Sequence, residues 1–390
     1  MSAYGIAAMA REFLCKSALP LWSTVGMDYN DGGFVERLHV NGAPDCHAVK
    51  RTLVQARQIY VYSHAAILGL APDGVATAQK GFEFLMRHAC PDGVARGFVH
   101  SMYRGGRVMD TTRVTYDHAF LLLAFSWFYR ASGSSEARRA INSILLILED
   151  LRHVSRRGYL EDSTAKLPRR QNPHMHLLEA FLAAYAATSC SQMLERAEEV
   201  VTLLEAHFTS NGKLREYFSD DLSAAPYPIG RIAEPGHHLE WVWLLDQYGR
   251  AAGKDLRETM VTLYRTARDY GTQFETGLVV NEIWMEGQVK DAAKRLWPQT
   301  EALKSELSME ILDGHQSILR ASEIVEGIFR YFLDPAPPGA WIDRLSTDNQ
   351  PLPGAIPATS LYHLFLAFSE YLSKLDHKEL GSYHVPGLAL

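Results

Sequence analysis

Ionisable side chains interrupt several stretches of this chain that are otherwise almost wholly apolar. His237 and Glu240 are three residues apart in PGHHLEWVWLL. Asn172 and His176 are four apart in NPHMHLLEA, and His363 lies in SLYHLF. Residues at these spacings share one helix face, and buried polar groups are costly unless they have partners. Because imidazole titrates near neutral pH, these histidines suit acid–base catalysis.

A second set of polar and aromatic residues occupies similar positions. An arginine can stabilise a developing oxyanion, and we expect the set to bind a substrate. Its members are Arg57 in VQARQIYVYSHA, Tyr116 in TYDHAF, Trp297 and Glu301 one turn apart in RLWPQTEAL, and Arg231 upstream of Pro235. Arg57 could instead pair with a carboxylate for structure, and His64 and His118 are expected to be structural.

Motifs for metal or nucleotide binding are weak or absent. His237 and Glu240 could coordinate one ion together, but the chain has no HExxH pattern and no cysteine pair spaced for zinc. It also lacks a GxGxxG or P-loop motif after a strand, and a GxSxG nucleophile elbow. We therefore expect neither a metal ion nor a cofactor.

The candidate residues lie in or beside stretches that are apolar on nearly every helix face. A helix of this kind is buried on all sides, which fits an inner layer of helices. The stretches cover residues 49–70, 115–131, 174–187, 237–248 and 358–372. Residues 192–208 and 254–270 mix charged and apolar side chains and fit an outer layer.

Six glycine-centred segments punctuate the chain at nearly even intervals. Their marker glycines, Gly33, Gly97, Gly158, Gly212, Gly277 and Gly339, are separated by 64, 61, 54, 65 and 62 residues. A period near 60 has room for two helices of about 11–20 residues with their connections. We predict an all-α (α/α)6 barrel, a toroid of six helical hairpins with short β-hairpins in the loops. Each pair must bury its apolar face on its neighbours, so residues 1–390 are expected to form a single domain.

Composition excludes several classes of function. The net charge is −6 and no basic block is present, so we expect no nucleic-acid partner. No apolar run approaches the length of about 18 residues that spans a membrane, and the N-terminus is expected to be an amphipathic helix rather than a signal peptide. Four scattered cysteines fit a reducing cytoplasm. The oligomeric state stays open, a homodimer included.

The motifs QARQIYVYSHA, NPHMHLLEAF, PGHHLEWVWLL, WPQTEAL and SLYHLF together resemble those of the N-acylglucosamine 2-epimerase superfamily. The resemblance covers almost the whole chain, and NPHMHLLEA with WPQTEAL is most similar to the mannose isomerase branch. It implies an (α/α)6 barrel in which His237 and His363 form an acid/base pair on opposite sides of a sugar. It also implies that the pocket is lined by Arg57, Tyr116, Asn172, His176, Glu240 and Trp297.

The implied activity is interconversion of D-mannose and D-fructose, and also D-lyxose and D-xylulose, through a cis-enediol. His363 is expected to be the base at C2 and His237 the acid. Glu240 is expected to orient His237, and His176 to open the sugar ring.

Four alternatives follow from the same residues. Returning the C2 proton to the opposite face would make the enzyme a 2-epimerase, acting on mannose and glucose or on N-acylated sugars. A phosphosugar is a further substrate. Helical toroids also carry glycoside hydrolases and lyases, which need two carboxylates flanking one bond, whereas the carboxylates Glu179, Glu240 and Glu301 here accompany histidines. A non-catalytic carbohydrate-binding protein would not need the paired histidines.

Overall fold

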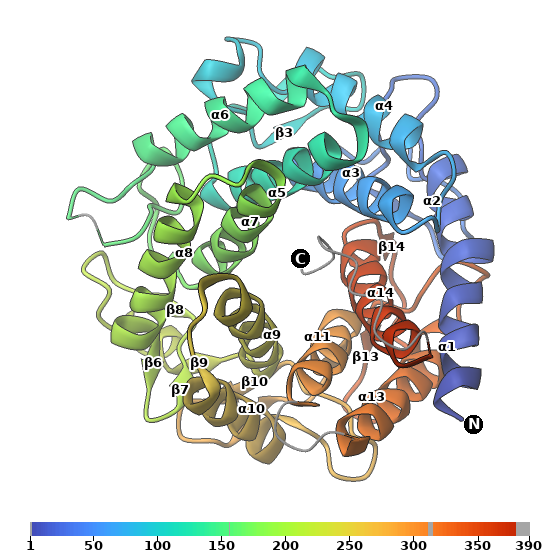
Figure 1. Ribbon diagram of the computed structural model, residues 1–390, viewed down its shortest axis with the longest axis vertical. Coiled ribbons are helices and arrows are strands. Elements are labelled where there is room, and N and C mark those ends of the chain that lie inside the picture. The colour runs from blue at the N-terminus through green and yellow to red at the C-terminus, as the bar shows by residue number, and fades with distance from the viewer. Residues whose placement is uncertain (1, 156, 311–314, 380–390) are drawn as a thin grey trace.

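Two concentric layers of helices form a ring in the computed structural model, which describes residues 2–155, 157–310 and 315–379 (Figure 1). The inner helices are α3 (Thr52–Ile67), α5 (Thr115–Ser132), α7 (Asn172–Thr188), α9 (Pro235–Ala252), α11 (Leu296–Ser308) and α14 (Ser360–Glu379). The outer helices are α1 (Ala3–Glu12), which continues through a π-helical stretch (Phe13–Ala18) into α2 (Leu19–Thr24), α4 (Gly74–His88), α6 (Ser135–Asp150), α8 (Gln192–Leu203), α10 (Arg257–Gly271) and α13 (His315–Ile328). The predicted toroid of helical hairpins is confirmed.

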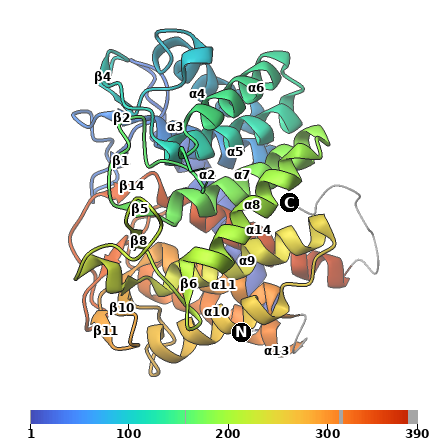
Figure 2. The ribbon, with the colours of Figure 1, turned by 90° about the vertical axis from the view of Figure 1, so that its left-hand side faces the viewer.

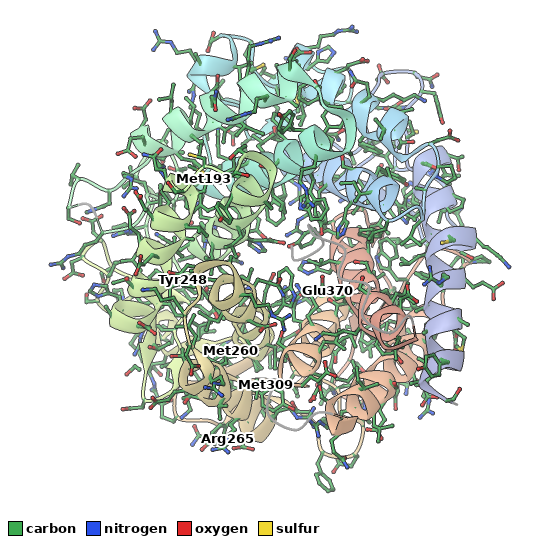
Figure 3. All side chains as sticks on the ribbon, in the orientation of Figure 1. Met193, Tyr248, Met260, Arg265, Met309 and Glu370 are labelled. Carbon is green, nitrogen blue, oxygen red and sulfur yellow. The ribbon has the colours of Figure 1, made fainter. Side chains whose placement is uncertain are left out.

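The apolar pattern of each helix decides its layer. In α5, Thr115, Asp117 and every residue from His118 to Phe128 are buried, whereas α6 buries one stripe that includes Ile141, Ile144 and Leu148. Buried side chains such as Met193 and Met260 fill the space between the layers (Figure 3). No described helix is both long and apolar enough to cross a membrane.

Short antiparallel strands gather at one end of the ring (Figure 2). Most pairs join one repeat to the next: β2 (Lys50–Arg51) with β3 (Ser101–Met102), β5 (Arg169–Arg170) with β8 (Tyr217–Phe218), β9 (Ile232–Ala233) with β10 (Glu282–Trp284), and β12 (Lys294–Arg295) with β13 (Arg344–Leu345). Local hairpins form where β3 meets β4 (Val108–Asp110), β6 (Thr209–Ser210) meets β7 (Lys213–Leu214), and β10 meets β11 (Val289–Asp291). The expectation of hairpins alone was therefore incomplete, because the strand before an inner helix pairs with the following repeat.

The two ends of the chain close the ring. β1 (Arg37–Leu38) pairs with β14 (Ile356–Pro357), with Leu38 opposite Ile356. The Gln58 amide on α3 donates to the Ala358 carbonyl oxygen at 2.8 Å, and the Tyr371 hydroxyl on α14 donates to that of Ala3 at 3.2 Å. Ring closure therefore involves contacts between strands at one end of the ring as well as contacts made by the helices.

All six marker glycines have left-handed backbone conformations, with φ between +68° and +86°. This conformation is open to glycine at little steric cost. At Gly158 an added Cβ would also lie 2.4 Å from Nε2 of His174. The even spacing seen in the sequence therefore reflects a glycine with positive φ that recurs in six loops.

A side chain at the third or fourth position of five inner helices fixes the neighbouring glycine loop. We call Gln55, His118, His174, His238 and Gln299 the loop clamps. Nε2 of His174 accepts from the backbone N–H of Tyr159 at 2.9 Å, and Nδ1 donates to the carbonyl of Arg170 at 3.0 Å. His118 and His238 make the corresponding pair of bonds. Gln299 does the same with an amide, accepting from the N–H of Val279 and donating to the carbonyl of Arg295.

The histidine clamps should make the fold sensitive to acid. Burial lowers the pKa of His174 to about 3, so the unfolded chain takes up a proton below its ordinary pKa of about 6.5 while the folded chain does not. The stability contributed by His174 is complete above pH 6.5 and is lost as pH falls toward 3, at about 1.4 kcal/mol per pH unit. His174→Gln, which copies the bonds of Gln299, should remove this slope in urea unfolding at pH 4–7. His174→Ala should instead lose about 1–3 kcal/mol at every pH, because the N–H of Tyr159 loses its partner. Equal slopes in the wild type and His174→Gln would contradict the assignment.

Candidate active site

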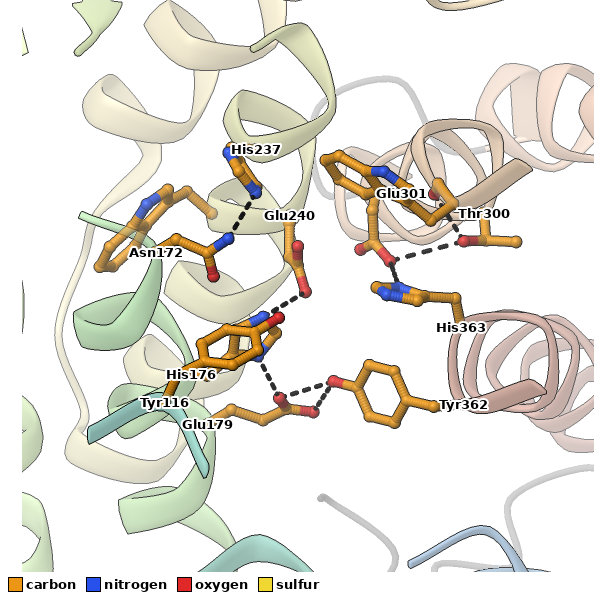
Figure 4. Close-up of polar contacts among 12 residues, drawn as sticks. Tyr116, Asn172, His176, Glu179, His237, Glu240, Thr300, Glu301, Tyr362 and His363 are labelled. Carbon is orange, nitrogen blue, oxygen red and sulfur yellow. Dashed lines mark hydrogen bonds and ion pairs between the residues drawn. The ribbon is translucent and has the colours of Figure 1, made fainter. Parts of the chain in front are cut away.

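Polar side chains converge at the N-terminal ends of the inner helices, where the strands also lie (Figure 4). The six inner helices all point the same way along the axis of the ring, and each begins at the end where the strands lie. Six helix N-termini therefore meet at this end. Helix N-termini carry a partial positive charge that favours anions. This end can therefore stabilise negative charge that develops on a bound molecule.

His237 lies at the third residue of α9 among carboxylates. Its Nδ1 is 3.0 Å from Glu216 Oε2 and 4.0 Å from Glu234 Oε2. Burial alone would lower the pKa of His237, but Glu216 and Glu234 outweigh burial and raise this pKa to about 9. His237 is consequently an imidazolium at neutral pH and can act as an acid.

Asn172 contacts the other nitrogen of this ring. Its Nδ2 lies 3.2 Å from Nε2 of His237, and its Oδ1 has no hydrogen-bond partner within the described residues. An imidazolium donates from both nitrogens. Turning the Asn172 amide by half a rotation lets Oδ1 accept a hydrogen bond from Nε2–H of His237. The amide oxygen and the imidazolium N–H then form a matched acceptor and donor.

His363 has the opposite electrostatic surroundings. It lies near the start of α14, and its Nδ1 is 2.9 Å from Glu301 Oε1 on α11. Burial, with the nearby cations Arg57 and Lys304, holds the pKa of His363 well below its ordinary value. The Trp297 ring contacts both histidines, with centroids 4.9 Å from His237 and 5.8 Å from His363. A protonated and a neutral imidazole thus flank one indole ring.

His176 lies deeper on α7 and bridges two carboxylates. Its Nδ1 is 3.1 Å from Glu179 Oε2, and its Nε2 is 3.8 Å from Glu240 Oε1. Burial lowers the pKa of His176 to about 4, and burial together with Glu301 raises the pKa of Glu240 to about 8. The Tyr362 hydroxyl donates to Glu179 at 2.5–2.6 Å. This network joins α7, α9 and α14.

Arg57 is held on α3 by aromatic neighbours. Its Nη2 donates to the Tyr116 hydroxyl at 2.9 Å, and its guanidinium lies over the rings of Phe120 and Tyr362, at 4.3 and 4.9 Å from their centroids. Its Nε has no partner among the residues placed by the structure. The cation is fixed without a carboxylate partner in hydrogen-bond contact, so its charge is available to a ligand.

The structure brings together all the site residues expected from the sequence except Arg231. Arg231 is exposed, pairs with Glu286 at 2.8 Å and lies over Tyr227 and Trp284. The expected role of Glu240 also differs, because Glu216 rather than Glu240 holds Nδ1 of His237. Residue 240 is one turn further along α9, which places its carboxylate beside His176.

Sequence reasoning missed three groups of the site, namely Glu216, Tyr362 and Lys304. Glu216 comes from the loop before β8, and no spacing links it to His237. The sequence did contain a signal for Lys304, because this lysine follows Glu301 by three residues in a helix that is otherwise buried.

Among the residues that the structure describes, two groups of three side chains bring metal-ligand atoms within 4.8 Å of one another. They are Glu216 with Glu234 and His237, and Glu240 with Glu301 and His363. Each group already contacts a cation of the protein, because Arg295 lies 3.0 Å from Glu234 and Lys304 lies 2.7 Å from Glu301. Metal independence remains a prediction.

Comparison with known proteins assigns the chain to a family. A mannose-6-phosphate isomerase of Rhizobium meliloti is 31% identical over 369 residues, covering 92% of this chain and 94% of that protein. A D-mannose isomerase of Thermobifida fusca is 30% identical over 239 residues, 56% of this chain and 57% of that protein. The structure of cellobiose 2-epimerase from Bacillus thermoamylovorans superposes with a TM-score of 0.86 at 19% identity, covering 95% of this chain and all of that one. The N-acylglucosamine 2-epimerase family model matches residues 32–367, and the chain therefore belongs to this family of sugar isomerases and epimerases.

Proposed function

We propose that the protein is an aldose–ketose isomerase that interconverts D-mannose and D-fructose, and also D-lyxose and D-xylulose. The observation that carries the proposal is the contrast in charge around two histidines across one site. Glu216 and Glu234 lie beside His237 and favour an imidazolium, whereas burial and the nearby cations Arg57 and Lys304 favour a neutral imidazole at His363. Transfer of a proton between adjacent carbons needs one acid and one base near neutral pH. Two relatives at 30–31% identity are named as isomerases of mannose or its phosphate, which supports this reaction.

The proposed reaction moves one proton from C2 to C1. His176, which lies between two carboxylates, assists opening of the sugar ring. Nε2 of His363 then takes the C2 proton while His237 donates a proton to O1, which gives the cis-enediol. The O2 proton returns to His237 and His363 delivers its proton to C1, so both histidines recover their starting states. Arg57 stabilises the negative charge on the enediol oxygens.

The charges at the strand end favour a neutral sugar over a phosphorylated one. Three arginines there are already matched by carboxylates: Arg51 with Glu36, Arg170 with Glu161 and Arg295 with Glu234. A phosphate group is best bound by unpaired arginine or lysine. Arg57, which bonds to Tyr116 rather than to a carboxylate, is used by the enediol oxygens in the proposed reaction. We therefore propose free mannose as the substrate, although one relative is named for the 6-phosphate.

A 2-epimerase is the second candidate. The family model is named for this reaction, and His237 is protonated and placed near His363 around Trp297. If His237 rather than His363 returned a proton to the sugar, and returned it to C2 instead of C1, the product would be the C2 epimer of the substrate. Glycosidic hydrolysis is less well supported, because Glu179 and Glu301 are each bonded to a histidine.

The reaction is tested by incubating the purified protein with D-mannose in deuterated water and following proton NMR. We expect fructose, with solvent deuterium at C1 in those turnovers in which the proton held on Nε2 of His363 exchanges with solvent before it is delivered. Glucose carrying deuterium at C2 would instead support the epimerase. In a parallel assay mannose 6-phosphate should react with a lower kcat/KM than mannose, and the reverse order would overturn the choice of a neutral sugar.

Replacing either proposed catalytic histidine should lower kcat by at least about 100-fold, the usual contribution of a general acid or base. The variants are His237→Asn and His363→Asn, with the clamp variant His118→Gln as a matched control that keeps near wild-type kcat. In the wild type, kcat/KM should fall above about pH 9 as His237 loses its proton. A variant that keeps more than a tenth of kcat, a loss under about 1.4 kcal/mol, excludes its histidine from the mechanism.

Proton transfer through an enediol needs no metal ion, whereas a hydride shift uses a divalent cation. Prolonged treatment with EDTA, followed by removal of the chelator, should leave kcat unchanged. Loss of activity that Mn²⁺ or Co²⁺ restores would contradict the mechanism. It would also assign an ion to one of the two carboxylate–histidine groups.

A further inference from the structure

Lys304 is a fully buried cation among the charged groups of the site. It follows Trp297 and Glu301 along one face of α11, and both Lys304 and Glu301 have no solvent-exposed side-chain surface. Its Nζ lies 2.7 Å from Glu301 Oε2 and 4.1 Å from the centroid of the Trp243 ring. The proposed reaction assigns no step to this residue.

Glu301 links Lys304 to His363. Its Oε2 faces the ammonium group, and its Oε1 lies 2.9 Å from Nδ1 of His363. An ionised carboxylate only accepts hydrogen bonds, so Nδ1 must carry the proton of the neutral ring. The lone pair of that ring is then on Nε2, the nitrogen that has no hydrogen bond to any residue the structure describes. This tautomer leaves Nε2 free to act as a base.

The charge of Lys304 decides whether Glu301 and His363 together hold an extra proton. With the ammonium present, a carboxylate and a neutral imidazole complete a group with no net charge. Without the ammonium, the same pair would be a buried anion, which is costly. Glu301 and His363 together would then keep one additional proton up to a higher pH. Burial raises the pKa of Glu301, and Lys304 is the strongest influence against that rise.

Other charged or titratable groups face these three residues from α3, α7, α9 and α14. They are Arg57 on α3, His176 and Glu179 on α7, His237 and Glu240 on α9, and Glu370 on α14. None of them has a hydrogen bond to Nδ1 of His363 among the described contacts. Replacing Lys304 also removes its charge from the surroundings of Glu179, Glu240 and Glu370. A second variant that also neutralises Glu301 therefore isolates the part of the effect that Glu301 carries.

We propose that Lys304 is a positioning residue that acts through Glu301, holding it as a carboxylate so that His363 keeps its proton on Nδ1 and a free lone pair on Nε2. The catalytic meaning of this arrangement rests on the proposed isomerase function. The protonation state itself does not, and it can be measured without a sugar.

The direct test is NMR of protein labelled with ¹⁵N-histidine, titrated from pH 5 to 9 without substrate. His363→Gln assigns the His363 signal. In the wild type, His363 should be neutral with the proton on Nδ1 near pH 7. In Lys304→Met it should stay protonated to a pH at least one unit higher. Glu301→Gln combined with Lys304→Met restores a neutral acceptor for Nδ1–H and should return His363 to its wild-type state.

Lys50→Met is the matched control, because Lys50 is also buried and pairs with Asp28 at 2.9 Å outside the site. It should leave the His363 titration unchanged. In parallel, the acid limb of kcat/KM should move upward in Lys304→Met by the same interval, with kcat recovering at high pH. A merely structural role would lower kcat equally at every pH.

The outcomes separate the two proposals. An unchanged His363 titration in folded Lys304→Met overturns the inference even if mannose is isomerised. A shifted titration in a protein that isomerises no sugar supports the inference and refutes the proposed function. If Lys304→Met does not fold, the double variant decides: a neutral His363 near pH 7 supports the inference, and an imidazolium there overturns it.

Discussion

The hydrogen bonds of the loop clamps are the constraint on which the rest of this structure depends. Each clamp ties the start of an inner helix to the glycine loop beside it, through a buried hydrogen bond from a backbone N–H of that loop. The site residues lie within about two turns of the same helix starts. Asn172 and His176, for example, flank the clamp His174, and His237 precedes the clamp His238. The geometry that packs the ring therefore also sets the directions in which the polar side chains point.

The site obtains two histidines of opposite protonation from unequal numbers of uncompensated carboxylates. Two carboxylates, Glu216 and Glu234, face His237, and only Glu234 is paired with a nearby arginine. His363 faces one carboxylate, Glu301, whose charge is balanced by Lys304. Both rings are buried, so burial alone would make both neutral. The difference between them comes from the surrounding charges.

Long-range periodicity allowed the fold to be predicted from the sequence. The short-range spacing of polar residues allowed most of the residues of the site to be predicted. Apolar coverage of every helix face marked the inner layer, and the glycines marked loops whose left-handed conformation few other residues adopt. Strand pairing was not predictable in detail, because two-residue strands have no measurable period and their partners lie in the next repeat. Glu216 was not predicted as a residue of the site, because it reaches His237 from a separate loop. Arg231 was included for its proximity in sequence to the α9 start, although its side chain turns to the surface and pairs with Glu286.

Ring closure by the last inner helix has a consequence for how the protein is made. α14 supplies His363 and Tyr362, and it packs against α3 and α1, which precede it in the chain. Contacts between such distant segments form slowly, because a long chain must be ordered to bring them together. A chain still emerging from the ribosome without residues 360–379 would carry His237 but have no partner across Trp297. In the proposed mechanism the acid–base pair is therefore incomplete until residues 360–379 have been made and packed, and a chain that lacks them would be inactive.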